Sequence, residues 1–198
     1  MSLKFGVKLL LSVFSVIYPF GLIFFSEFNF VLLVIMAILW GLRGIFEFDK
    51  PNLDEFNQKN SKFKKENLSE FGKFSFVLCG FFAFCAIFNA YGLKYLYPVL
   101  INAFLGFLFY FSLNKTPMIT KFAMLKEPNL DEKAKFYTRN LTKIWIVFFA
   151  INGLVSAILA CFENKIYWGV YCGAISYILI GILFFGEIIF RKLYIKNG

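Results

Sequence analysis

Residues 114–145 read NKTPMITKFAMLKEPNLDEKAKFYTRNLTKIW and form the longest polar interruption in the second half of the chain. Strongly apolar segments flank its polar part, at 95–113 and from residue 141 onward. About 20 apolar residues are enough for a helix to cross roughly 30 Å of hydrocarbon. The stretch therefore predicts a loop at a membrane surface, between two membrane-spanning helices.

The chain as a whole is strongly apolar. Of its 198 residues, 60% are hydrophobic and 22% aromatic, and the mean hydropathy is +0.69. This is too apolar for a soluble domain, whose polar surface must cover one core. We predict an all-α polytopic membrane protein, a single integral membrane domain over residues 1–198 with cytoplasmic loops at about 47–70 and 114–140. Windows of spanning length predict about six transmembrane helices, at 5–25, 29–46, 71–90, 95–113, 141–162 and 167–190.

The first window begins like a secretory signal, because Lys4 and Lys8 precede an apolar run. No small-x-small cleavage site follows the run, so we expect a retained first helix.

The net charge is +9, and the positions of the basic residues along the chain follow the predicted membrane topology. All Lys and Arg residues except Lys94 and Lys165 lie near the termini, between residues 43 and 73, or between residues 115 and 143, that is, in or beside the two long polar loops. The positive-inside rule then predicts that both termini and both loops are cytoplasmic. Such basic segments favour anionic lipid headgroups, so the charge does not predict a nucleic-acid partner.

Several classes of protein chemistry lack the residues they need. The chain has no histidine, which excludes His-ligated haem, His-based metal sites and Ser-His or Cys-His nucleophiles. Its four cysteines all lie inside predicted spans, so neither a disulfide framework nor a zinc site is expected. No charged residue occupies the middle of a predicted span, whereas proton and ion relays usually need one. We predict no catalytic residue, no metal site and no cofactor.

Polar residues within the later spans are the candidate functional face. Asn152 lies deep in its span and should find a partner, either through a structural hydrogen bond between helices or through a ligand. Trp145 shares its face and lies at the level of the headgroups. The full candidate set is Tyr97, Asn102, Arg139, Trp145, Asn152 and Glu187. In the last span, small residues recur on one side and predict packing against the preceding helix or, in a homo-oligomer, another copy: Gly169, Gly173 and Gly181.

The loop itself carries helix signals. Thr116 and Pro117 are a cap and first-turn signal, and apolar residues at helical spacing predict a short helix lying in the interface. These apolar residues are Met118, Phe122 and Leu125, opposite Thr120 and Lys121. Two interpretations of the loop remain: a stop-transfer loop with solvated charges, or a surface for cytoplasmic docking or headgroup contact. The candidate contact residues are Lys115, Lys121, Lys133 and Lys135.

One pentapeptide occurs twice. The letters PNLDE stand at residues 51–55 and again at 128–132. In both copies an asparagine can cap a helix whose first turn holds acids, which gives the repeat a local physical cause. We therefore predict helix starts at Asn52 and Asn129. Internal duplication is the rival explanation, and the Tyr-Pro pairs at 18–19 and 97–98 lend it some support.

Two groups of bacterial membrane proteins show related residue patterns. Lys115, Pro117, Met118 and Ile119, followed by Arg139, Trp145, Phe148, Phe149 and Gly153, resemble the intracellular septation protein A family. The chain differs from that pattern by Thr116 between Lys and Pro and by Asn152 before Gly153. It is also similar to uncharacterised membrane proteins associated with aryl polyene and fatty-acid-like biosynthesis genes, which share Tyr97, Pro98, Asn102 and Glu187. The resemblance implies a bacterial inner membrane and an envelope or lipid context.

Three functional hypotheses follow. The first is a non-catalytic membrane scaffold in cell-envelope or lipid biogenesis, whose cytoplasmic loop recruits a cytoplasmic or membrane protein partner. The second is a lipid or polyene product binding or translocation protein, with a groove between the fourth, fifth and sixth spans. The third is an intramembrane enzyme, which would need its polar side chains to meet. We predict the first of these functions, the scaffold, and expect membrane lipids among the molecules that the protein contacts.

Overall fold

The computed structural model describes residues 3–48, 58–88, 92–127 and 129–196. Over these ranges the chain is helical and has no strand, as the composition predicts. The long helices are α1 (Leu3–Phe24), α2 (Asn29–Phe48), α3 (Gln58–Ile87), α4 (Tyr97–Ser112), α6 (Glu132–Cys161) and α8 (Ser176–Lys196). The shorter elements are η1 (Ser26–Phe28), η3 (Leu93–Leu96), α5 (Met118–Lys126), α7 (Lys165–Val170) and the π-helical turn η4 (Tyr171–Ile175).

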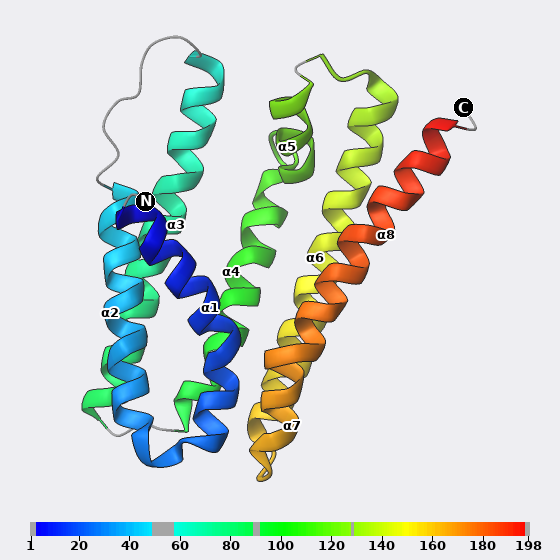
Figure 1. The fold of residues 1–198 in the computed structure, drawn as a ribbon. Coiled ribbons are helices and arrows are strands. Elements are labelled where there is room, and N and C mark those ends of the chain that lie inside the picture. The colour runs from blue at the N-terminus through cyan, green and yellow to red at the C-terminus, as the bar shows by residue number, and fades with distance from the viewer. Residues whose placement is uncertain (1–2, 49–57, 89–91, 128, 197–198) are drawn as a thin grey trace.

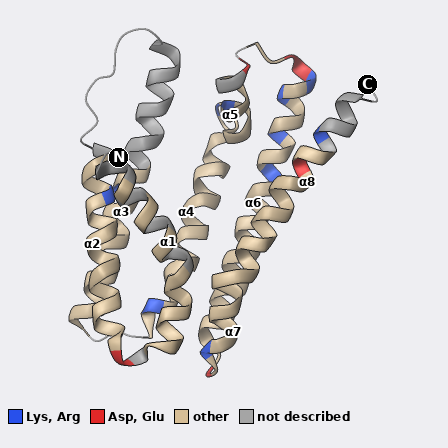
Figure 2. Cartoon of the chain, viewed as in Figure 1, with Lys and Arg blue, Asp and Glu red and all other residues tan. Residues whose placement is uncertain are grey.

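Successive long helices run in opposite directions (Figure 1). In this view α1, α3 and α6 run downward, whereas α2, α4 and the continuous rod α7–η4–α8 run upward. Helix α5 is seen nearly end-on, so it crosses the direction of α4 and α6. Lysines and arginines gather at the upper end of α6 (Figure 2). Helix α7, which begins at Lys165, and η3, which contains Lys94, lie at the opposite end of the molecule (Figure 1).

In the described part of the chain, four helical stretches are long and apolar enough to cross a membrane. They are Asn29–Phe46, Leu93–Ser112, Glu132–Cys161 and Lys165–Ile189, and Phe71–Ile87 is a shorter apolar helix. Their outward side chains are large and apolar: Ile151 and Ile182, for example, are 57% and 63% exposed. Single exposed apolar residues are normal on soluble proteins. Rings of them along several helices instead fit contact with lipid.

The main hydrophobic core packs α1, α2 and α3 against the first residues of α4 and against α7 and η4. Tyr18 of α1 contacts Phe82 of α3 edge to face at 5.7 Å and Tyr97 of α4 at 5.1 Å. Trp168 of α7 is fully buried beside Tyr95, and its Nε1 donates a hydrogen bond of 3.0 Å to the Tyr95 carbonyl. A smaller core of Phe109, Met118 and Phe149 lies between α4, α5 and α6. It positions the candidate site.

The glycine face of the last span packs within the chain. A Cβ atom on Gly169 would collide with Ile23 of α1, and one on Gly173 would come within 2.5 Å of the Phe20 ring. Gly181 has no atom within 4 Å of such a Cβ. The predicted packing against the preceding helix is therefore wrong for Gly169 and Gly173, because α1 occupies that face. A second copy could reach only Gly181 of the three.

Several predicted boundaries also change. Helix α3 begins at Gln58, so much of the predicted polar loop at 47–70 is helical, and the first PNLDE copy lies outside the described residues. The second copy does not start its helix at Asn129. Asp131 is the N-cap of α6, and its Oδ1 accepts a hydrogen bond of 2.7 Å from the Ala134 amide. The acidic side chain performs the capping because the helix begins two residues later than predicted.

Candidate functional site

Helix α5 is fixed to the ends of α4 and α6 by side-chain hydrogen bonds. Ser112, the last residue of α4, accepts a hydrogen bond of 2.9 Å from the Met118 amide. The Ile119 amide donates to Thr142 Oγ1 at 3.3 Å. Two of the first amides of α5, which have no partner within the helix, are thereby satisfied. We call α5 together with residues 132–143 of α6 the platform.

A buried hydroxyl pair completes this attachment. Thr120 Oγ1 and Thr138 Oγ1 lie 2.7 Å apart, and both residues are buried. Thr138 also donates to the carbonyl of Ala134 one turn earlier. The predicted placement of Thr120 opposite the apolar residues of α5 is therefore wrong. Thr120 is buried like Met118, because its hydroxyl finds Thr138 there. Phe122, in contrast, is 53% exposed, and the Leu125 side chain lies outside the described residues.

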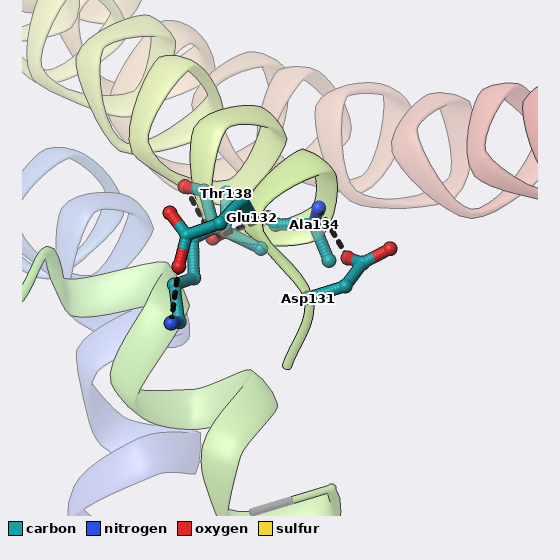
Figure 3. A network of polar contacts seen from close by, with 5 residues as sticks. Asp131, Glu132, Ala134 and Thr138 are labelled. Atoms are coloured by element: carbon teal, nitrogen blue, oxygen red, sulfur yellow. Dashed lines mark hydrogen bonds and ion pairs between the residues drawn. The ribbon is translucent and has the colours of Figure 1, made fainter. Parts of the chain in front are cut away.

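The start of α6 carries the charges of the platform. Figure 3 shows Asp131 capping the helix at Ala134 and Glu132 paired with Lys135, whose Nζ lies 2.7 Å from Glu132 Oε1. The Glu132 side chain of that pair is largely exposed, whereas that of Lys135 is partly covered. Acids in the first turn also complement the helix dipole. The acids of the PNLDE motif are thus used locally, and the exposed charge that remains on α6 is basic.

A groove of about 420 Å³ lies between α5 and α6. Its lining is part basic and part apolar: Lys115, Thr116, Pro117, Thr120, Met124, Glu132, Lys135, Phe136 and Arg139. Arg139, Lys115 and Lys135, predicted separately from the sequence, thus come together. Lys133 is exposed on α6 and Lys121 is half-buried on α5, and neither lines the groove.

The deep polar residues form a second, closed cluster. Asn152 Nδ2 donates to Asn102 Oδ1 at 3.0 Å, which is the predicted hydrogen bond between spans. Tyr171 in the π-helical turn donates its hydroxyl hydrogen to Asn152 Oδ1 at 2.8 Å. Asn102 Nδ2 donates to the Pro98 carbonyl, one turn earlier in α4. Both asparagines are buried and have protein partners, so their arrangement needs no ligand.

The other three candidate residues, Tyr97, Trp145 and Glu187, belong neither to the groove nor to the asparagine cluster. Tyr97 is buried in the aromatic core beside Tyr18 and Trp168. Trp145 packs against Phe109 and Phe149 in the small core. Glu187 Oε1 lies 3.4 Å from Arg191 Nε, one turn later on α8, so its ion pair is within its own helix. The six candidates therefore do not form one face.

The two basic residues at the opposite end have local roles. Lys165 donates to the carbonyls of Ala160 and Phe162 at the end of α6, where the helix dipole favours a cation. Lys94 and Lys165 each place the ammonium group 5.0 Å from the centre of the Tyr95 ring, a distance suited to cation–π attraction. These contacts explain two charges that do not follow the topological pattern.

Sequence reasoning missed the residues that hold the platform together. Ser112, Thr138 and Thr142 carry the hydrogen bonds described above. The signal available in the sequence was the spacing of Thr138 and Thr142, small polar residues one turn apart on α6. No such signal marked Tyr171. It is the first residue of the π-helical turn η4, a departure from α-helical spacing that the sequence does not reveal, and its hydroxyl contacts Asn152 from there.

Comparison with protein-family models, curated proteins and solved structures finds no match. The resemblance to the septation and polyene-associated groups therefore stays a prediction.

Proposed function

We propose that the chain is a multi-pass protein of the bacterial inner membrane with six spans and with both termini in the cytoplasm. The spans are α1, α2, α3, α4, α6 and the rod α7–η4–α8. The alternating directions of these helices support this topology, as does the gathering of basic residues at one end of the described chain (Figure 2). The positive-inside rule assigns that end to the cytoplasm. The platform is then on the cytoplasmic side.

Within that membrane, the protein serves cell-envelope or lipid biogenesis as a non-catalytic scaffold. The observation that carries this proposal is the platform: a short helix held across the ends of two spans by three hydrogen bonds, with basic side chains at its surface. A fixed surface loses less conformational freedom on binding than a mobile loop does. Its positive charge fits a protein partner with an acidic surface.

The closed polar cluster supports a scaffold more than translocation between spans. A Cβ atom on Gly153 would lie 3.2 Å from the Asn102 Cβ, so α4 and α6 touch closely at that level. The Asn102–Asn152 hydrogen bond closes the same contact. The lipid or polyene translocation hypothesis would require these helices to separate. The groove of the platform is the observation that favours lipid binding as a second function.

Native mass spectrometry of the protein, extracted gently from its own membranes, tests the scaffold. We expect a protein partner bound in fixed stoichiometry. The double substitution Lys121→Glu and Lys133→Glu should release it, because it reverses two platform charges outside the groove. Lys73→Glu on α3 is the control: Lys73 is exposed but lies outside the platform. Absence of any partner from the wild type, or retention of the partner by the double variant, would contradict the scaffold proposal.

A further inference from the structure

We propose that the groove between α5 and α6 binds the phosphate headgroup of an anionic glycerophospholipid. This inference rests on the membrane placement in the proposed function, but not on a protein partner. The groove volume of about 420 Å³ is within the range of small-ligand sites. It lies where α4 ends and α6 begins, so a headgroup there can remain attached to acyl chains running along the bundle.

The charges of the groove fit a phosphate group. Lys135 and Arg139 lie one turn apart on α6, and Lys115 contributes from the connection between α4 and α5. Glu132 is the acid among the lining residues, and Lys135 already pairs with it at 2.7 Å. The lining therefore retains an excess of positive charge. An arginine guanidinium matches phosphate oxygens with two parallel hydrogen bonds, and lysine adds a point charge.

The other lining residues favour a lipid over a soluble anion. Pro117, Met124 and Phe136 give the groove apolar walls, and Phe136 is 68% exposed. Phe122 is also exposed, on the neighbouring α5. Inorganic phosphate gains nothing from such surface, whereas the glycerol backbone and upper acyl carbons of a lipid would cover it. Charged and apolar groups at the same opening match an amphiphile.

The groove is also formed before any ligand arrives. The Thr120–Thr138 contact and the hydrogen bond from the Ile119 amide to Thr142 hold α5 against α6. Lys115 lies three residues before Met118, whose amide is bonded to Ser112. The walls therefore keep their spacing through contacts that a lipid need not supply, and preorganisation of this kind favours binding.

The test compares two double variants of the full chain with equal loss of charge. Lys115→Gln with Arg139→Gln removes two groove cations, whereas Lys133→Gln with Lys143→Gln removes two exposed cations of α6 that do not line the groove. Purified protein is titrated with phosphatidylglycerol or phosphatidylcholine in mixed micelles, and native mass spectrometry counts the bound lipids. Each cation near an anionic lipid contributes about a fivefold effect. We expect the groove variant to bind phosphatidylglycerol about 25-fold more weakly, and the control variant to lose clearly less binding, because its two cations do not line the groove.

Three results would overturn the inference. Equal losses in the two double variants would mean general attraction between a basic surface and anionic lipid. Equal retention of phosphatidylglycerol and phosphatidylcholine by the wild type would mean that the groove does not distinguish an anionic headgroup from a zwitterionic one. Displacement of the lipid by millimolar inorganic phosphate would mean a soluble-anion site. In each case the scaffold proposal stands or falls separately, because the Lys121→Glu, Lys133→Glu variant reports on it.

Discussion

At the residue scale, the buried asparagine pair links two spans through one hydrogen bond that can be isolated. Asn152→Ala removes the donor to Asn102 Oδ1 and the acceptor of Tyr171. Hydrogen bonds between membrane helices contribute about 0.6 to 2 kcal/mol. We expect Asn152→Ala to lower the free energy of unfolding by about 1 to 2 kcal/mol in a denaturant titration in micelles.

A double-mutant cycle with Asn102→Ala gives the energy of the pair itself. Ile151→Ala is a matched truncation on the lipid-facing side of the same helix, where the side chain is 57% exposed. Its effect should be smaller. Additive losses from Asn102→Ala and Asn152→Ala would show that the two side chains do not interact.

The cap of α6 is a second residue-scale feature, and here the structure corrects the sequence prediction. Asp131→Ala removes the acceptor of the Ala134 amide and should weaken the first turn by about 1 kcal/mol. Hydrogen exchange of the amides at 132–136 should then become about fivefold faster. Asn129→Ala, at the predicted cap, should leave this exchange unchanged. The reverse result, with faster exchange only for Asn129→Ala, would restore the prediction.

At the element scale, packing of the last span on α1 depends on small residues. Gly173→Leu would place side-chain atoms into the Phe20 ring, whereas Gly181→Leu meets open space. Overpacking of this kind costs about 1 to 3 kcal/mol. We expect Gly173→Leu to lower the melting temperature of the purified protein. Gly181→Leu should leave both melting temperature and oligomeric state unchanged if the chain is monomeric.

Size-exclusion chromatography with light scattering distinguishes the remaining possibility. If Gly181→Leu converts an oligomer into a monomer, the homo-oligomer prediction survives at that residue alone. A Gly173→Leu variant as stable as wild type would contradict the packing of η4 on α1. The four-residue spacing of the glycines predicted a close contact, but spacing cannot say which helix makes it.

The same limit explains the other differences in the elements. Apolar windows placed the helices because burial in lipid depends on composition along the chain. They missed the start of α3, since helical structure at 58–70 is built from polar residues. Helical spacing in 118–125 also placed Thr120 on the polar side of α5, whereas it turns inward because its hydroxyl has a partner on α6. Residue types predicted the elements, whereas contacts distant in sequence decide their faces.

At the scale of the whole molecule, the candidate site was only partly predictable. The basic residues of the groove were singled out because charge clusters are visible in sequence. That Lys115 meets Lys135 and Arg139 depends on α5 folding back across the spans. The six candidate residues do not share one place in the structure, since Tyr97, Trp145 and Glu187 lie in three different contacts. A partner for Asn152 was expected from its depth in the span, whereas its pairing with Asn102 depends on how α4 and α6 pack.

The side of the membrane on which the platform lies is the claim on which scaffold and lipid site both depend. Single cysteines replacing Lys133 and Asn164, in a chain whose four cysteines are changed to alanine, can be labelled with a membrane-impermeant maleimide in bacterial spheroplasts. Both positions are exposed and lie at opposite ends of α6. We expect Asn164→Cys to react in intact spheroplasts and Lys133→Cys to react only after permeabilisation. Labelling of Lys133→Cys in intact spheroplasts would contradict the account.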